Sequence, residues 1–419
     1  MANPVRQSRH AAHATAVFDV INVAFATPTV SHGSTMQFAP DPAIYPDAGE
    51  FRAEIEALQR EGKRILISIS GASDPIVVDD STDVAAFVAS MQEILQTYGF
   101  DGVDIDLEGT SLYLVPGDDD FRNPTSPRIL RFIEAIRSLM TLFPDRLLSA
   151  APETACVQGG YQSYGGIWRA YLALLHALRD RIACVRVQHY NTGSMFGRDG
   201  NIYDPATADF HVAMADVLLA GFPVDRWGNA IYFDPLCQSQ VTVGLPAGPS
   251  AGSGYTPPDI VHQALDYLIL ATPFGGQYEL AQPDGYPGFR GLMTWSINWD
   301  VYYECEFSTS HREYLDSLPT SSVPVADRSG FSRVFLSHRC APNPAGATTV
   351  LRYELGRGAP IGIELFDLQG RMVWRKEARW RDVGTHALRL DLSGLPSGIY
   401  PYGLRAADRE VRGRICLHP

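Results

Sequence analysis

The sequence predicts an α/β fold, a (β/α)8 TIM barrel, followed by a small all-β sandwich domain. Short apolar runs alternate with amphipathic stretches from residue 16 to about 318, and beyond about 330 the pattern changes to short strands and turns. The charge also changes between these parts: residues 331–419 hold 14 Lys and Arg against 8 Asp and Glu, whereas residues 1–330 hold 20 against 39. With 419 residues and roughly 150 per domain, two or three domains are expected.

Each element of the first part follows from this alternation. Runs such as 64–71 are almost continuously apolar, which is typical of strands buried on both faces of a parallel sheet. Stretches such as 84–99 are long enough and periodic enough to be amphipathic helices. Strands are predicted at 16–26, 64–71, 100–108, 146–153, 182–190, 241–246 and 291–298, and helices at 50–62, 84–99, 126–140, 167–180, 207–221 and 258–271.

Seven strands fall one short of the closed barrel, which needs eight. An open doubly wound sheet is the competing interpretation, although no G-x-G-x-x-G follows the first strand. The first barrel strand is the element that is missing, because residues 1–15 are polar and do not suit a buried strand.

The second part is predicted to be a separate β-domain. Residues 319–330 are rich in Pro, Ser and small residues and are expected to be a linker between a barrel domain at 16–318 and a sandwich at 331–419. A disulfide between Cys340 and Cys416 is a minority interpretation. Strands are predicted at 348–355, 361–368, 371–379, 385–392, 398–406 and 411–417.

Composition excludes several classes of protein. The net charge of −13 argues against a general nucleic-acid binder, and no apolar run reaches the ~20 residues of a membrane span. None of the six cysteines forms a C-x-x-C pair, so no zinc motif is present. The first residues show no apolar segment of a signal peptide.

The segment FDGVDIDLE carries the candidate chemistry. Asp104, Asp106 and Glu108 share one face of the predicted strand, which ends at the edge where barrels carry their active sites. Carboxylates this close repel one another, so at least one is expected to hold a proton near neutral pH, as a general acid must. A metal site is the rival interpretation, but no histidine ligands or calcium loop support it, and we expect neither a metal nor a cofactor.

The motif D-G-x-D-x-D-x-E at residues 101–108 resembles the signature of glycoside hydrolase family 18 chitinases of bacterial type. INVAFA (21–26), S-x-G (68–71), APE (151–153), VQGGYQSYGGIW (157–168), QHYN (188–191) and GLMTWSINWD (291–300) are also similar to segments of that family. The resemblance covers residues 16 to about 310 and includes nearly every predicted strand end.

The resemblance implies roles for the acidic residues. Glu108 would protonate the glycosidic oxygen and later act as base, while the 2-acetamido oxygen of the substrate serves as nucleophile. Asp106 would accept a hydrogen bond from the acetamido N–H and orient that group. Asp104 would share a proton with Asp106, and Glu153 would either bind substrate or brace the barrel rim.

The family resemblance also implies roles for residues that are not acidic. Tyr190 would donate to the acetamido oxygen, and Gln188 and Asn191 match the Q-x-Y-N form of the substrate-binding motif. Trp295 would lie flat under the sugar at the cleavage subsite. Trp168 and Trp227 could be outer subsites or core residues.

One further residue and one further motif are expected to take no part in catalysis. His189 is expected to be structural, because it falls on the opposite strand face from Gln188. The G-x-S-x-G at 248–252 imitates the nucleophile elbow of serine hydrolases, but no helix follows it directly, so a loop is predicted.

The function implied is endo-acting, retaining hydrolysis of chitin or chito-oligosaccharides by a monomer. An endo-β-N-acetylglucosaminidase of N-glycans and a chitin-binding lectin without activity are the alternatives. The presence of Glu108 argues against the lectin.

The C-terminal part resembles the sorting domain of the type IX secretion system, through Asn343-Pro344, L-x-G-R at 368–371 and LPSGIYPYGLRA at 395–406. A structural β-module or a carbohydrate-binding module is the alternative. The resemblance implies contact with secretion machinery and a secreted or cell-surface bacterial protein. Because a signal peptide and the first barrel strand are missing at the same end, an N-terminally truncated gene model is expected.

Overall fold

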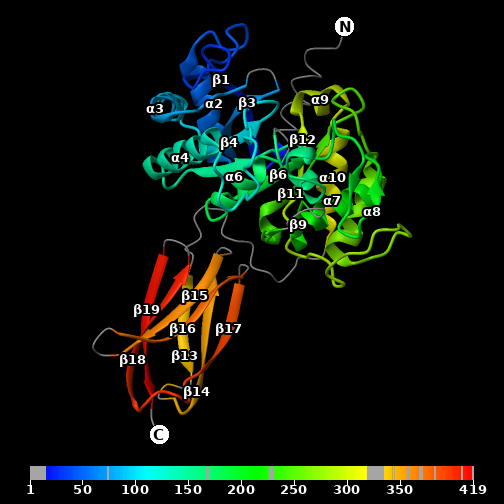
Figure 1. Ribbon diagram of the computed structural model, residues 1–419. Coiled ribbons are helices and arrows are strands. Elements are labelled where there is room, and N and C mark those ends of the chain that lie inside the picture. Colours follow the sequence, from blue (N-terminus) through cyan, green and yellow to red (C-terminus); the bar gives the residue numbers. More distant parts are fainter. Residues whose placement is uncertain are drawn as a thin grey trace. The chain divides into compact units, whose positions relative to one another are not determined.

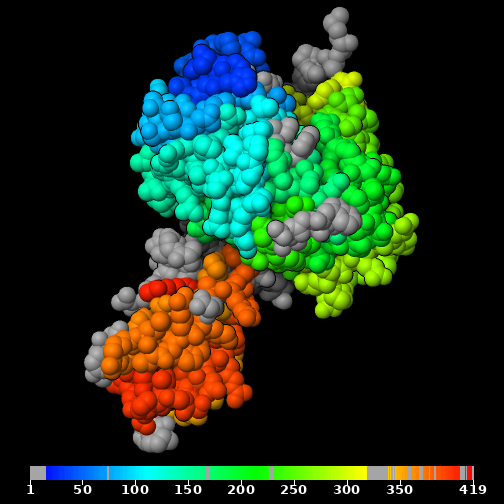
Figure 2. Space-filling model, viewed as in Figure 1, coloured from blue at the N-terminus to red at the C-terminus, as the bar shows by residue number. Residues whose placement is uncertain are grey.

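The structure is a computed structural model of the chain. It describes residues 16–72, 75–166, 169–225, 231–318, 335–341, 343, 345–355, 359–367, 371–381, 384–406 and 409–417. The chain divides into two compact units, Met1–Thr320 and Ser321–Pro419. The first unit is coloured blue to yellow, and the second orange to red, in Figures 1 and 2.

One sheet forms the centre of the N-terminal unit (Figure 1), with the strand order β12–β11–β6–β5–β4–β3–β1–β2. Neighbouring strands are parallel, apart from the short β2, which pairs with β1 in antiparallel orientation. The strands are β1 (Val20–Pro28), β2 (Met36–Gln37), β3 (Arg64–Gly71), β4 (Gly102–Leu107), β5 (Leu147–Ala150), β6 (Cys184–Gln188), β11 (Val241–Pro246) and β12 (Gly291–Trp295). All seven predicted strands of this unit are confirmed within a few residues.

Helices alternate with these strands and lie outside the sheet (Figure 1). Side-chain caps explain where several begin: Asp80 accepts from the N–H groups of Thr82 and Asp83, and Thr207 accepts from that of Phe210. No helix among the described residues is long and apolar enough to cross a membrane. The helices are α2 (Ala48–Arg60), α3 (Ser81–Tyr98), α4 (Pro127–Leu142), α6 (Tyr171–Ala177), α7 (Ala208–Ala220) and α8 (Pro258–Leu270).

The barrel is not closed within the described residues. Strands β12 and β1 stand at the two ends of the parallel sheet, and no ladder joins them in this part of the chain. The rings of Phe25 on β1 and Trp295 on β12 nevertheless stack with centroids 5.9 Å apart. The sheet therefore curves enough to bring its two ends together at their carboxyl tips. The expectation concerning residues 1–15 lies outside the described residues.

Several short elements between the main ones are not predicted by periodicity. These elements are α5 (Thr154–Val157), η1 (Gln158–Tyr161), β7 (Met195–Phe196), β8 (Ile202–Tyr203), β9 (Phe222–Val224), β10 (Ile231–Phe233), η2 (Gln238–Gln240), α9 (Ile297–Tyr302) and α10 (Glu306–Ser317). Helices α5 and η1 follow β5 at its carboxyl end, and α9 and α10 complete the unit after β12.

The described part of the C-terminal unit consists of antiparallel strands in two sheets, ordered β13–β14–β17 and β16–β15–β18–β19. Residues from both sheets, including Leu351 and Leu404, belong to one hydrophobic cluster. Cys340 and Cys416 are not bonded to each other, so the disulfide interpretation is not supported. The strands are β13 (Phe335–Ala341), which was not predicted, β14 (Thr348–Leu355), β15 (Ala359–Phe366), β16 (Met372–Arg381), β17 (Gly384–Asp391), β18 (Gly398–Ala406) and β19 (Arg409–Leu417).

Candidate active site

Strand β4 places a row of carboxylates on the inner side of the curved sheet. The apolar residues that alternate with them belong to the hydrophobic core, so the acidic side chains point to the other face. Asp104 and Asp106 are buried, with exposed fractions of 1% and 8%. Glu108 follows directly after the strand and is half-buried. The row therefore ends at the carboxyl edge of the sheet, where barrel enzymes carry their active sites.

Asp104 lies deepest and is surrounded by donors from the adjacent strands β3 and β5 and from β6, the strand beyond β5. The Oγ of Ser68 on β3 donates to its Oδ2 at 3.0 Å, and the Oγ of Ser149 on β5 donates to Oδ1 at 2.5 Å. The guanidinium of Arg186 on β6 donates to Oδ1 at 2.8 Å. A buried carboxylate needs such partners, because an unpaired charge inside a protein is costly.

Gln188 at the end of β6 joins the other two carboxylates. Its amide nitrogen lies 3.0 Å from Oδ1 of Asp106 and 3.2 Å from Oε1 of Glu108. The same nitrogen donates to the carbonyl oxygen of Ala151 at 2.9 Å, which fixes the orientation of the amide. Gln188 thus holds Asp106 and Glu108 beside each other.

The surroundings of the row favour retention of a proton. Burial, followed by the negative charges of Asp104 and Glu108, raises the pKa of Asp106 well above its ordinary value of 3.8. Burial is also the main reason why the pKa of Glu108 is raised, with a contribution from the charge of Glu153. The hydrogen bond from Gln188 lowers both pKa values and only partly offsets these effects. The directions agree with a general acid near neutral pH.

Tyr190 stands beside the row, two residues beyond Gln188, and is 8% exposed. Burial and the charges of Asp106 and Glu108 raise the pKa of its phenol well above the ordinary value of 10.0. The phenol therefore stays protonated at all ordinary pH values and is available as a hydrogen-bond donor.

Trp295 ends strand β12 and leaves an aromatic face open to solvent. Its side chain is 37% exposed, and its ring stacks on Phe25 at an interplanar angle of 22°. An exposed aromatic ring at the carboxyl edge suits contact with the apolar face of a sugar.

Glu153 and Asn191 lie at the same edge with different partners. Glu153 follows β5, pairs with Gln188 through a backbone bridge, and accepts a weak hydrogen bond from the thiol of Cys156 at 3.6 Å. The Oδ1 of Asn191 accepts from the backbone N–H of Ser253 at 2.9 Å. Asn191 therefore ties the end of β6 to the loop after β11.

Arg186 and Tyr171 are among the residues of this site that the sequence analysis does not predict. Arg186 is a charged residue inside an apolar strand at even spacing from Gln188, a signal that identifies an inward-facing group. Tyr171 on α6 accepts a hydrogen bond from the N–H of Leu107 at 2.6 Å and so braces the end of β4. Its distance from the motif in sequence leaves no such signal.

The other residues and motifs considered in the sequence analysis are either placed away from the chemistry or lie outside the described residues. The imidazole of His189 is buried and contacts that of His211, Nδ1 to Nδ1, at 3.2 Å, in agreement with a structural role. The G-x-S-x-G segment is confirmed as a loop, because the next helix begins only at Pro258. Trp168 and Trp227 lie outside the described residues.

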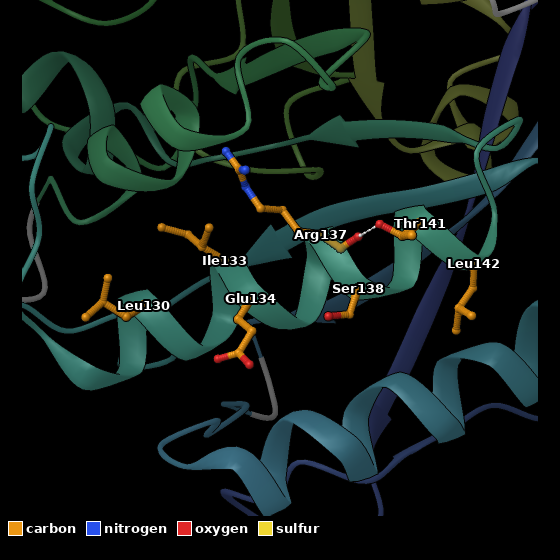
Figure 3. Close-up of a pocket in the computed structure, with 7 residues that line it drawn as sticks. All are labelled: Leu130, Ile133, Glu134, Arg137, Ser138, Thr141 and Leu142. Atoms are coloured by element: carbon orange, nitrogen blue, oxygen red, sulfur yellow. Dashed lines mark hydrogen bonds between the residues drawn. The ribbon is translucent and has the colours of Figure 1, made fainter. Parts of the chain in front are cut away.

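A shallow hollow lies elsewhere, along the outer surface of α4 (Figure 3). It contains none of the carboxylates of β4, and its lining comes from this single helix. The lining residues are Leu130, Ile133, Glu134, Arg137, Ser138, Thr141 and Leu142.

Comparison with known proteins identifies the family of the chain. Residues 3–213 match the family model of glycosyl hydrolases family 18. Chitinase Chi52 of Paenibacillus xylanexedens is 49% identical over 309 residues, and the match covers 73% of this chain and 58% of Chi52. A probable class II chitinase of Arthroderma benhamiae is 39% identical over 315 residues, which is 72% of this chain and 93% of that protein. The chain thus spans only about three fifths of the length of Chi52.

A solved structure and a second family model extend the comparison. The crystal structure of a family GH18 chitinase from Chromobacterium violaceum is 35% identical, with a TM-score of 0.66, and the match covers 73% of this chain and 78% of that one. Residues 340–417 match the secretion system C-terminal sorting domain. The predicted sorting domain is thereby confirmed, and it supports the predicted secreted or cell-surface location.

Proposed function

The chain belongs to glycosyl hydrolases family 18, and we propose that it cleaves internal bonds of β-1,4-linked N-acetylglucosamine polymers with retention of configuration. The observation that carries this proposal is the bridge from Gln188 to Asp106 and Glu108. It holds a carboxyl group with a raised pKa at the open edge of the sheet, beside a second carboxyl group that can orient the substrate. Cleavage of internal bonds rests on the family resemblance.

The first step requires a proton and a nucleophile. Glu108 donates its proton to the glycosidic oxygen as the bond from C1 to that oxygen breaks. The carbonyl oxygen of the 2-acetamido group attacks C1 from the opposite face and forms a cyclic oxazolinium ion. Glu108, now ionised, then removes a proton from water as the water attacks C1 and opens the ring. Two inversions give net retention.

The neighbouring residues orient the acetamido group in this scheme. Asp106 accepts a hydrogen bond from its N–H, and the protonated phenol of Tyr190 donates to its carbonyl oxygen. Gln188 positions both carboxylates, while Asn191 and Glu153 shape the edge on which the sugar lies. Trp295 supports the apolar face of that sugar.

The same proposal extends to the whole chain. Residues 16–318 would form the catalytic domain, with 319–330 as linker and 331–419 as a β-sandwich engaged by the secretion machinery. The two-sheet hydrophobic cluster supports the sandwich. A complete (β/α)8 barrel would need one more strand between β12 and β1. We propose that the chain acts as a monomer.

Mass-resolved product analysis tests the proposal. The protein is incubated with chitin hexasaccharide and, in parallel, with an N-glycosylated protein. Dimers and trimers from the hexasaccharide are expected. Release of glycan from the glycoprotein alone would establish the endo-β-N-acetylglucosaminidase instead, and intact hexasaccharide bound to folded protein would establish the lectin.

A further inference from the structure

The loop after β11, residues 247–254, has contacts with two strand ends of the candidate site. It contains the G-x-S-x-G segment at 248–252, which has no role in the proposed mechanism. At its start, the N–H of Ala247 donates to the carbonyl oxygen of Trp295 on β12 at 2.9 Å. At its end, the loop is bonded to Asn191, which lies beyond β6. The loop therefore connects the strand end that carries the exposed indole with the one that carries the phenol of Tyr190.

The end of the loop lies directly against Tyr190 and the residue that follows it. The N–H of Asn191 donates to the carbonyl oxygen of Ser253 at 3.0 Å, and the N–H of Ser253 donates to Oδ1 of Asn191 at 2.9 Å. A Cβ atom at Gly252 would lie 3.1 Å from Oδ1 of Asn191 and 3.4 Å from Cδ2 of Tyr190. Glycine thus allows the loop to contact both side chains, and a larger residue at this position must displace at least one of them.

The middle of the loop is held by Tyr303, which follows directly after α9. Its hydroxyl accepts a hydrogen bond from the N–H of Ser250 at 3.1 Å and donates one to the Oγ of Ser250 at 2.7 Å. A Cβ atom at Gly248 would lie 2.1 Å from Cδ2 of the Tyr303 ring, so no side chain fits between the ring and the loop. The two glycines of the segment therefore stand at two close approaches, one to Tyr303 and one to Tyr190.

We propose that loop 247–254 is a positioning element that fixes the phenol of Tyr190, with Gly252 and Tyr303 as its positioning residues. This inference rests on the proposed function, in which Tyr190 donates to the acetamido oxygen. Strand β6 ends at Gln188, so Tyr190 lies outside the strand and its ring depends on contacts from neighbouring segments. The place of the donor matters, because a small misplacement of a group that acts in the transition state already lowers the rate.

NMR of the protein labelled with ¹³C at Cζ of tyrosine tests the placement without any need for activity. The signal of Tyr190, one of 19 tyrosines, is identified by its absence from Tyr190→Phe. Gly252→Val should move this signal. The control is Gly193→Val, a change at an exposed glycine whose Cβ would meet no atom within 4 Å, and it should leave the signal in place. An unmoved signal in folded Gly252→Val would overturn the inference.

The kinetics of chitin hexasaccharide cleavage test the consequence. Gly252→Ala should lower kcat and Gly252→Val should lower it further, to about a tenth of the parent value. KM should change little, since the donor acts in the transition state. In the Tyr190→Phe background no hydroxyl remains to be misplaced, so Gly252→Val should cause no further loss. Equal losses of kcat in both backgrounds would overturn the inference, because the loop would then act on another group.

Tyr303→Phe tests the other contact of the loop. It removes both hydrogen bonds to Ser250 but keeps the ring over Gly248, so kcat should fall about threefold, and this loss should also vanish in the Tyr190→Phe background. Tyr302→Phe, the same change at the preceding residue, is the control. Equal kcat values for these two variants would overturn the role of Tyr303. A folded parent without activity would refute the proposed function, while the NMR result would still decide whether the loop fixes Tyr190.

Discussion

The amide nitrogen of Gln188 lies 3.2 Å from Oε1 of Glu108, although 80 residues separate them in the sequence. The contact crosses the inner side of the sheet, since β5 stands between the strands that carry the two residues. Gln188 at the end of β6 thereby orients Glu108, which follows β4. The expected consequences of this arrangement can be measured residue by residue.

Gln188→Leu should lower kcat about tenfold and move the alkaline limb of kcat to higher pH. A hydrogen bond to a carboxylate favours the ionised form, and the bond from Gln188 lowers the pKa of both Asp106 and Glu108. Its loss therefore raises both pKa values. Gln162→Leu, the same change at an exposed position, is the control. A limb that stays in place or moves to lower pH would contradict this role.

Tyr190→Phe should lower kcat by about tenfold to a hundredfold with little change in KM. The phenol is proposed to donate to the acetamido oxygen as that oxygen becomes the nucleophile, so the loss falls on the transition state. Tyr302→Phe removes the hydroxyl of a tyrosine that is 69% exposed and serves as control. Equal kcat values for the two variants would exclude the proposed donor.

Trp295→Ala should raise KM for chitin hexasaccharide about tenfold, and Trp295→Phe should recover most of the loss. The reason is that the proposed contact depends on a flat aromatic face, which Phe retains. Isothermal titration of the hexasaccharide provides a direct affinity. Equal affinities of the alanine variant and the parent would show that the sugar does not lie on this ring.

The buried histidine pair should make the N-terminal unit sensitive to acid. Burial lowers the pKa of His211 from 6.5 to about 4, because the folded protein disfavours its charged form. Its contribution to stability is therefore present above pH 6.5 and is lost as the pH falls toward 4. This loss amounts to ~3 kcal/mol in the free energy of unfolding.

Urea unfolding between these pH values, followed in the parent and in His211→Asn, measures this effect. The variant should be less stable at neutral pH, because it loses the hydrogen bond of 2.8 Å to Thr256, and its stability should depend less on pH. His32→Asn changes an exposed histidine and should keep the slope of the parent. A parent slope retained in His211→Asn would assign the acid sensitivity to other groups.

Much of the fold follows from patterns within short segments. The strands at 64–71 and 241–246 are predicted to the residue, because continuous apolar runs between turn residues define buried strands without reference to the rest of the chain. The missed elements are short or polar. Helix α10 (Glu306–Ser317) buries only three residues. Its hydrogen bonds to α8, from Tyr314 to Asp266 and between His311 and His262, join residues almost 50 positions apart in the sequence.

In the site, too, local patterns are predicted from the sequence, whereas contacts between distant segments are not. The alternation of Asp104, Asp106 and Glu108 with apolar residues predicts a common face, which the structure contains. The sequence does not predict which residues bond to these carboxylates. Arg186, Ser149 and Gln188 lie on other strands, and they reach the carboxylates only because of the order of those strands in the sheet.

The most direct test of the account is the rate of hexasaccharide cleavage by Glu108→Gln. Glutamine keeps the shape of the side chain but has no proton to give to the leaving oxygen, so the rate should fall by about 10²–10⁴-fold while the hexasaccharide still binds. Glu134→Gln, the same change in the hollow on α4, should cleave like the parent. Cleavage by Glu108→Gln at a rate near that of the parent would contradict the central claim that Glu108 is the general acid.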